Sequence, residues 1–165
     1  MSYHREAAYK ANLIDIQKAD PAKLEEYKRV FDNSPLYNHY FKKNPELLEK
    51  WLVEFMPNAY IAVDRNGNSV GWASISASDP LTDGLPNITL LAVKDTARGR
   101  GIGQMLLNFY MSVMQQLGYE ECAVVVNDWN PRARKLYDSL GFKLRKSFDD
   151  PFVGGWTDHM LVKKL

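Results

Sequence analysis

The chain has 165 residues, of which 45% are hydrophobic and 25% are charged, and its net charge is +1. This length suits one domain with a core of its own, and the small net charge argues against a general surface for nucleic acid. No stretch has the length and apolar content of a membrane span, and the N-terminal residues lack the apolar run of a signal peptide. We therefore expect a cytoplasmic protein with neither nucleic acid nor a membrane as a partner.

Cysteine and histidine usage adds two further exclusions. Cys122 is the only cysteine, so the chain has no internal disulfide, which is compatible with a reducing compartment. His4, His39 and His159 show no metal-ligand spacing with it. We expect a single domain over residues 1–165 that holds no metal.

The N-terminal third predicts one strand followed by helices. Residues before about Ala8 are polar and predict a loose end, and residues 11–17 predict a first strand. Asp20 and Pro21 are the residue types of a helix N-cap and first turn, and this helix should end near residues 33–35.

Two further helices and a hairpin follow. Residues 36–56 are rich in aromatic residues at helical spacing, and a break at Asn44-Pro45 predicts two helices whose aromatics mostly pack in the core. Residues 59–63 and 69–76 read as strands joined at Asn66-Gly67, a pair that suits a type I′ turn. Two prolines and a glycine then predict a loop up to the next strand.

The central stretch combines a strand, a glycine-rich loop and a helix. Residues 88–93 are an apolar, β-branched run, and residues 94–103 contain three glycines and two arginines. Apolar residues at helical spacing continue from Ile102 to Leu117, and Gly118 is a natural stop. A glycine loop that opens a helix leaves backbone N–H groups free at the positive end of the macrodipole, which predicts an anion site.

Two common phosphate motifs fit this loop poorly. A mononucleotide P-loop needs Gly-Lys-Ser/Thr, but Gln104 and Met105 follow Gly103, so this motif is rejected. The dinucleotide fingerprint is matched at Gly99 and Gly101, whereas Gln104 stands in place of its third glycine. Dinucleotide binding therefore stays open only as an alternative.

The C-terminal third predicts three strands and one helix. Residues 121–126 form an apolar strand run, and Cys122 within it is expected to be an inert core thiol. Asn130 is a helix N-cap candidate, Pro131 suits the first turn and Gly141 ends the helix. Two more strand runs lie at residues 142–148 and 156–165. Strands and helices in this order predict a mixed sheet flanked by helices.

Two motifs resemble the GNAT superfamily of acyl-CoA-dependent N-acetyltransferases. Residues 98–103, Arg-Gly-Arg-Gly-Ile-Gly, match the pattern Gln/Arg-x-x-Gly-x-Gly/Ala. Residues 130–142 match Asn-x-x-Ala-x-x-Leu-Tyr-x-x-x-Gly-Phe almost position for position. The resemblance covers residues 88–142 and implies an α/β (α+β mixed) GNAT-like fold, with a mostly antiparallel six- to seven-stranded sheet, about four helices, and strands four and five splayed.

The resemblance also implies how a coenzyme would bind. Amides of residues 99–104 would cradle the coenzyme A pyrophosphate, and amides of residues 91–93 would bond the pantetheine arm between strands four and five. The implied coenzyme-binding residues are Leu91, Ala92, Val93, Arg98, Gly99, Arg100, Gly101, Ile102, Gly103, Gln104, Asn130, Arg134 and Tyr137. Two purely structural alternatives remain open, since Asn130 also suits a helix cap and exposed arginines need no specific role.

The catalytic residue that the resemblance implies is Tyr137, whose phenol would protonate the leaving thiolate. The alternative is a core tyrosine, because the side chain also lies on the inner face of its helix. No carboxylate occurs in residues 88–93, so the general base is open. Asp79, Asp128 and His159 are candidates without positional support, and a water relay or the absence of a base is equally compatible.

The implied function is transfer of an acetyl group from acetyl-CoA to a primary amine of a small molecule or peptide. The amine would attack directly within a ternary complex, and no metal would take part. The alternative is a non-catalytic acyl-CoA-binding or regulatory module of the same fold. Loop aspartates and aromatics suit a cationic acceptor, and the aromatic C-terminal strand is compatible with a homodimer. The acceptor itself stays open.

Overall fold

A computed structural model describes residues 13–165. The predicted loose end before Ala8 and the start of the first predicted strand lie outside the described residues. The chain forms two compact units, of which the first comprises residues up to Ile75 together with Thr89–Phe109. The second unit comprises Ser76–Ile88 and Tyr110–Leu165.

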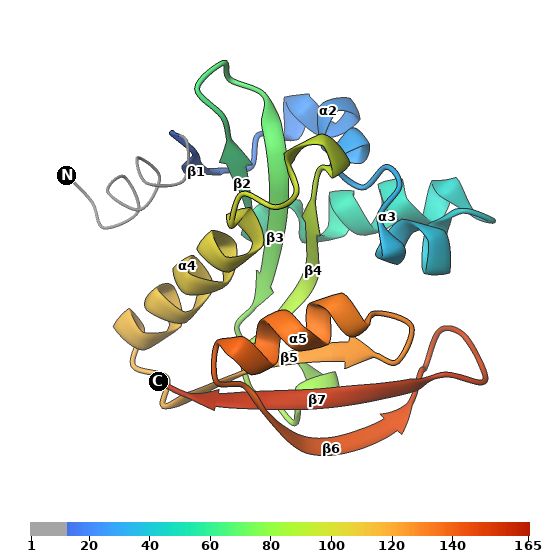
Figure 1. The fold of residues 1–165 in the computed structure, drawn as a ribbon, viewed down its shortest axis with the longest axis vertical. Coiled ribbons are helices and arrows are strands. Elements are labelled where there is room, and N and C mark those ends of the chain that lie inside the picture. Colours follow the sequence, from blue (N-terminus) through green and yellow to red (C-terminus); the bar gives the residue numbers. More distant parts are fainter. Residues whose placement is uncertain (1–12) are drawn as a thin grey trace. The chain divides into compact units, whose positions relative to one another are not determined.

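The described residues contain seven strands and four α-helices (Figure 1). The strands are β1 Asp15–Lys18, β2 Ala59–Val63, β3 Ser69–Ser76, β4 Asn87–Val93, β5 Glu121–Asn127, β6 Lys143–Asp149 and β7 Thr157–Lys164. The α-helices are α2 Leu24–Val30, α3 Pro45–Phe55, α4 Ile102–Gln116 and α5 Pro131–Ser139. The hydrogen-bonded strand order is β1-β2-β3-β4-β5-β7-β6. The predicted mixed sheet and its helices are confirmed.

The first unit packs helices on both faces of β2, β3 and β4. Ile61, Trp72 and Leu90 join the core cluster formed with α2 and α3. Their strand neighbours Ala62 and Ala73 join a second cluster formed with the N-terminal half of α4. Successive strand residues point to opposite faces, so the near-continuous burial of these strands follows from two covered faces.

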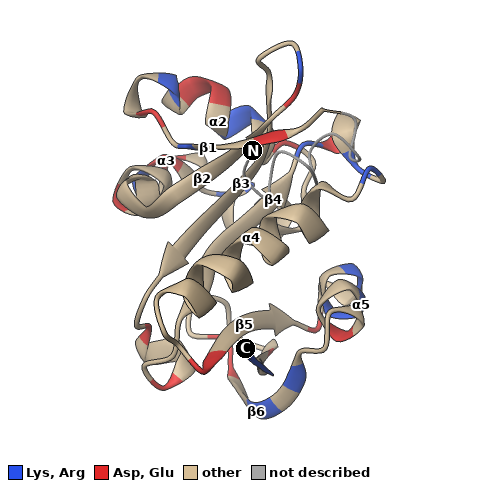
Figure 2. Cartoon of the chain, turned by 90° about the vertical axis from the view of Figure 1, so that its left-hand side faces the viewer, with Lys and Arg blue, Asp and Glu red and all other residues tan. Residues whose placement is uncertain are grey.

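The face of the sheet under α4 is made of small residues. Gly71 pairs with Ala62 across β2 and β3, and a Cβ atom at Gly71 would lie 3.0 Å from a Leu106 methyl and 3.1 Å from an Ile102 methyl. The missing side chain therefore lets the first turns of α4 lie directly on β3. α4 carries no charged residue and is uncharged along its whole length in Figure 2.

The break predicted at Asn44-Pro45 is confirmed, but the segment before it is a single π-helical turn, Tyr37–Phe41. The Lys42 N–H donates to the Tyr37 carbonyl at 2.9 Å, five residues back. The Ser34 hydroxyl accepts from the Tyr37 N–H at 2.9 Å at the start of the turn. One extra residue in a turn is what distinguishes a π-bulge from an α-helix, and apolar spacing alone does not reveal it.

The predicted hairpin is confirmed, but its turn type is corrected. A type I′ turn needs positive φ at both central residues, and only Gly67, at φ 81°, meets this condition. The Gly67 N–H donates to the Asp64 carbonyl at 3.0 Å, and Asp64 Oδ1 also accepts from the N–H groups of Asn66 and Asn68. This aspartate side chain selects a five-residue connection over a two-residue turn.

The second unit contains the antiparallel set β5-β7-β6, α5 and the C-terminal half of α4. Tyr110 anchors α4 there, since its buried hydroxyl donates to the Ala123 carbonyl at 2.9 Å. β4 enters this unit only through its first residues, and its parallel pairing with β5 is limited to Asn87 and Ala123. This single pair is consistent with the predicted splay of strands four and five.

None of the helices in the described part of the chain is long and apolar enough to cross a membrane.

Candidate functional site

The glycine loop, residues 94–103, follows β4 and leads into α4. A 3₁₀ turn, Asp95–Ala97, comes first, and Gly99 and Gly101 then adopt φ values of 81° and 77°. Positive φ is costly for residues with a Cβ atom. Space is not the constraint, because a Cβ at either glycine would meet nothing within 4 Å. The glycines are therefore required by the loop conformation, and they leave its outer side open.

Free backbone amides occur where the loop meets α4. The first helical hydrogen bond runs from the Met105 N–H to the Gly101 carbonyl at 2.9 Å. The amides of Ile102, Gly103 and Gln104 therefore have no acceptor within the helix. They lie at the positive end of a 15-residue helix dipole. Open glycines, with amides that have no acceptor within the helix, are the features that suit an anionic group at such a loop.

Arg98 braces the loop. Its Nε donates to the Val93 carbonyl at 3.3 Å, and its terminal amino group donates to the Asn33 carbonyl at 3.3 Å. The Asn33 side chain in turn donates to Asp95 Oδ2 at 2.9 Å. These bonds tie the end of β4 and the turn after α2 to the loop. Arg100, by contrast, is exposed. The two arginines of the motif thus have different surroundings.

The predicted coenzyme residues of β4 lie in the same unit as the loop. Ala92 is buried in the cluster with α2 and α3, whereas Leu91 and Val93 are half-buried against the α4 cluster. Residues 91–93 and 98–104 therefore form one continuous strand, loop and helix start. No carboxylate side chain occurs along β4, as the sequence already indicated.

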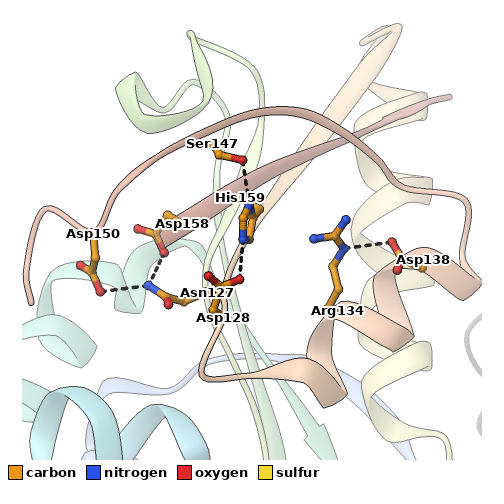
Figure 3. Close-up of polar contacts among 8 residues, drawn as sticks. All are labelled: Asn127, Asp128, Arg134, Asp138, Ser147, Asp150, Asp158 and His159. Atoms are coloured by element: carbon orange, nitrogen blue, oxygen red, sulfur yellow. Dashed lines mark hydrogen bonds and ion pairs between the residues drawn. The ribbon is translucent and has the colours of Figure 1, made fainter. Parts of the chain in front are cut away.

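The second unit holds the other predicted site residues on α5. Asn130 is the N-cap, and its Oδ1 accepts from the Ala133 N–H at 3.2 Å. Arg134 Nε lies 3.2 Å from Asp138 Oδ1, one turn along the exposed side of the helix (Figure 3). The cap prediction is confirmed. The Arg134 guanidinium has an intrahelical partner that the spacing i, i+4 makes possible.

Tyr137 is buried on the inner side of α5, with 6% of its surface exposed. Its ring meets Phe142 edge-on at a centroid distance of 6.1 Å. Gly141, at φ 90°, turns the chain so that Phe142 returns to this ring, which gives a packing reason for the spacing Tyr-x-x-x-Gly-Phe. Burial raises the pKa of the Tyr137 phenol. The side chain is therefore a neutral O–H donor at neutral pH.

Comparison with known proteins decides the family. The model of the acetyltransferase (GNAT) family matches residues 24–142, well over half of the chain. The chain belongs to the GNAT family. Membership confirms the resemblance of the two motifs and decides against the dinucleotide-binding alternative. It also extends the match upstream of the motifs, to the start of α2.

Individual GNAT relatives are distant. A mycothiol acetyltransferase from Thermobispora bispora is 29% identical over 97 residues, which are 57% of this chain and 32% of that protein. The chain thus spans about a third of the length of this curated relative. A proposed GNAT acetyltransferase from Desulfovibrio desulfuricans has a TM-score of 0.74 at 14% identity, over 92% of this chain and 98% of that one. A chain of the NatC complex bound to Gag peptide and CoA has a TM-score of 0.70 at 22% identity, with the same coverage of each chain. These structures confirm the GNAT-like fold.

One hydrogen-bonded chain in this GNAT protein connects two of the predicted base candidates. His159 Nε2 lies 2.6 Å from Asp128 Oδ1, and His159 Nδ1 lies 2.7 Å from the Ser147 hydroxyl (Figure 3). Asp128 follows the end of β5, and β7 places His159 opposite Val126. The strand pairing therefore supplies the positional support that the sequence lacked. Ser147 was missed, because an isolated serine in a polar strand carries no signal.

The third base candidate, Asp79, has a structural task. Its Oδ1 accepts from the Leu81 N–H at 2.9 Å as a helix cap, and its Oδ2 accepts from the Asn87 amide at 2.9 Å. The cysteine prediction also holds. Cys122 is fully buried, and burial raises the pKa of its thiol to about 11, so the reactive thiolate is scarce at neutral pH.

A buried polar cluster holds the end of β5 beside Asp128. Asn127 Nδ2 donates to Asp158 Oδ1 at 2.9 Å and to Asp150 Oδ2 at 3.1 Å (Figure 3). Asp150 Oδ1 also accepts from the Phe152 N–H at 2.8 Å. The amide thus fixes the β6–β7 loop to the strand that precedes Asp128. The sequence placed Asp150 on a loop and Asp158 in the terminal strand, and it gave no sign that either is buried.

Proposed function

We propose that this chain is an N-acetyltransferase that transfers an acetyl group from acetyl-CoA to a primary amine of a small molecule or peptide. The amine attacks the thioester directly in a ternary complex. The observation that carries the proposal is the glycine loop, whose free amides at the start of α4 suit a diphosphate, in a chain of the GNAT family. The CoA bound in the related NatC structure supports the choice of coenzyme.

The residues proposed to hold the coenzyme divide by the kind of contact. Backbone amides of residues 99–104 bind the diphosphate, and backbone groups of residues 91–93 bind the pantetheine arm. The exposed Arg100 provides a mobile charge, while Arg98 keeps the loop in shape through its bonds to Val93 and Asn33. Asn130, Arg134 and Tyr137 complete the proposed set from α5.

Tyr137 is proposed to act as the acid. Collapse of the tetrahedral adduct breaks the carbon–sulfur bond, and the departing sulfur needs a proton or a hydrogen bond. Burial keeps this phenol protonated because it raises its pKa. The same shift makes the phenol a weaker acid than an exposed tyrosine, so its hydrogen bond to the sulfur does much of the stabilising before the proton moves.

Asp128 and His159 are proposed to act as the base. Asp128 Oδ1 accepts a hydrogen bond from His159 Nε2–H, which leaves the lone pair on Nδ1 facing the Ser147 hydroxyl. Nδ1 then takes the proton that the acceptor nitrogen loses as it attacks, by way of the Ser147 hydroxyl or a water molecule. This assignment fills the role for which β4 offers no carboxylate.

A thiol-release assay over a panel of amines tests the function. We expect free CoA to appear with at least one primary amine, and the Tyr137→Phe variant to lose about 100-fold or more in kcat. Coenzyme affinity should stay unchanged in the variant. Tyr119→Phe, which alters an exposed tyrosine of the same unit, is the control. Equal kcat values for wild type and Tyr137→Phe would remove the acid role.

The alternative function, a non-catalytic acyl-CoA-binding module, rests on the absence of a carboxylate on β4. It predicts thermal stabilisation by acetyl-CoA with no thiol release for any amine. The same panel therefore separates the two functions. Thiol release by the wild-type chain would show that it is an enzyme and exclude the non-catalytic module.

A further inference from the structure

The second unit contains a basic pocket that the proposed reaction does not use. Its volume is about 430 Å³, and none of the residues assigned to the coenzyme lines it. It lies where β5 and β6 begin and β7 ends. The charged residues that line it are Glu121, Lys143, Arg145, Lys163 and Lys164. We call it the basic pocket below.

Strand register gathers these charges from three strands. Glu121 of β5 pairs with Lys164 of β7, and Cys122 pairs with Lys163. Lys143 of β6 pairs with Val162 on the other side of β7. Residues that pair directly lie close together on one face of the sheet. Lys143 and Lys164 therefore share one face of the sheet, while Lys163, the neighbour of Lys164, points to the opposite face at the same end, and all three line the pocket.

A bulge in β6 adds the arginine. Leu144 pairs with Leu161 and Lys146 pairs with Met160, so Arg145 is the extra residue. A bulge redirects the side chain of the inserted residue. The Arg145 guanidinium reaches Glu121 with two hydrogen bonds, of 2.6 and 3.3 Å. These bonds lower the pKa of Glu121, so it remains a carboxylate.

The charge in the pocket is unbalanced. Glu121 is matched by Arg145, whereas the three lysines form no ion pair within the part of the chain that the structure describes. The pocket thus carries three uncompensated positive charges in a chain whose net charge is only +1. Figure 2 shows basic segments along β6. A concave site with one sign of charge focuses the field and attracts counter-ions.

Lys163 is the most confined of the three. It is half-buried, and a Cβ atom at Gly141 would lie only 2.8 Å from its ammonium nitrogen. The glycine therefore gives the ammonium group room at the end of α5. Lys143 and Lys164 are exposed and free to approach a ligand. One half-buried and two exposed ammonium groups offer several N–H donors to a multivalent anion.

We propose that the basic pocket binds a small molecule through a di- or triphosphate group. Lysine ammonium groups bind phosphate as point charges, and a single carboxylate would leave most of this charge unmatched. The pocket is separate from the α5 residues proposed for the coenzyme. It lies at the start of β5, and Asn130 follows the other end of this seven-residue strand, about 20 Å away along the strand.

Calorimetric titration of the full chain with inorganic tripolyphosphate tests the proposal. We expect saturable binding that weakens as KCl rises from about 50 to about 200 mM, because salt screens exposed charges. The double variant Lys143→Gln/Lys164→Gln should bind about tenfold or more weakly, since it loses two charged contacts. The matched control, Lys42→Gln/Lys43→Gln, removes two exposed lysines elsewhere and should bind as the wild type does.

Three outcomes would overturn the proposal. The first is undiminished tripolyphosphate binding in the Lys143→Gln/Lys164→Gln variant. The second is loss of binding in a Gly101→Val variant of the loop, which would place the anion at α4. The third is equally tight binding of a glutamate-rich peptide, which would make the pocket a general anion surface. The KM for acetyl-CoA in the lysine variant separates this proposal from the proposed function. It should stay at the wild-type value, and if no amine is acetylated the titration still decides on the pocket.

Discussion

At the scale of single residues, the folded chain gives several motif residues a structural partner. Arg98 holds two backbone carbonyls, and Asn130 caps α5. Such bonds do not compete with coenzyme binding where the coenzyme contacts backbone amides, because the side chain then only has to hold the backbone in place. Substitution of Arg98 is therefore expected to weaken coenzyme binding by changing the conformation of the loop. Loss of a positive charge in contact with the coenzyme is not the expected cause.

The base assignment is tested at His159. His159→Gln keeps a polar side chain but cannot take up a proton, so kcat should fall about 100-fold while the KM for acetyl-CoA stays at the wild-type value. Asp128→Asn removes the acceptor that fixes the ring tautomer, and it should lower kcat less than His159→Gln does. Steady-state rates with one amine acceptor measure both variants. A His159→Gln variant with the wild-type kcat would exclude the base role.

At the scale of elements, contact between β3 and α4 sets the position of the proposed anion site. The small side chains of Ala62 and Ala73, with Gly71 between them, form the surface on which α4 rests. The first turns of α4 carry the free amides of the glycine loop. A change in this packing therefore moves the amides as well as lowering stability.

The substitution Gly71→Ala tests whether the packing of α4 on β3 positions these amides. The added methyl group would approach Leu106 and Ile102 at 3.0 and 3.1 Å, so we expect a loss of about 1 to 3 kcal/mol from overpacking. Urea unfolding measures the loss, and the coenzyme affinity should fall in parallel as α4 shifts. Gly154→Ala is the control, because its Cβ would meet nothing within 4 Å. Equal losses in the two variants would contradict close packing as the cause.

At the scale of the whole molecule, a buried thiol and two buried phenols make the stability of the fold sensitive to high pH. Burial raises the pKa of Cys122 from 9.0 to about 11, and burial also raises the pKa of Tyr110 and of Tyr137 above 10.0. The folded state therefore holds these protons at pH values where the unfolded chain releases them. Stability is complete below pH 9 and is lost as the pH rises towards the folded pKa values.

We expect the free energy of unfolding to fall by about 2 to 3 kcal/mol between pH 9 and 11 from Cys122 alone. The tyrosines should add to the loss above pH 10. Urea titrations at several pH values measure the slope. Cys122→Ala is expected to be less stable at pH 7 but to show a shallower fall between pH 9 and 11. An unchanged slope would show that this thiol does not titrate with unfolding.

The sequence alone determined the order of elements, the glycine loop and the family, because these depend on local conformation and on motif spacing. Helical periodicity identified α4, and positive φ at Gly99 and Gly101 is a local need that glycine meets. The type of the turn at Gly67 was not predicted, because the side-chain hydrogen bonds of one aspartate select it among similar local conformations. The π-helical turn at Tyr37 was not predicted, because it differs from an α-helical turn by one inserted residue.

Only the tertiary structure decided which distant side chains meet. The register of β5 against β7 brings His159 to Asp128, and it brings Lys163 and Lys164 to the strand that begins at Glu121. A shift of one residue would turn every one of these side chains to the opposite face. Register depends on the packing of both sheet faces at once, and no local stretch of the chain carries that information.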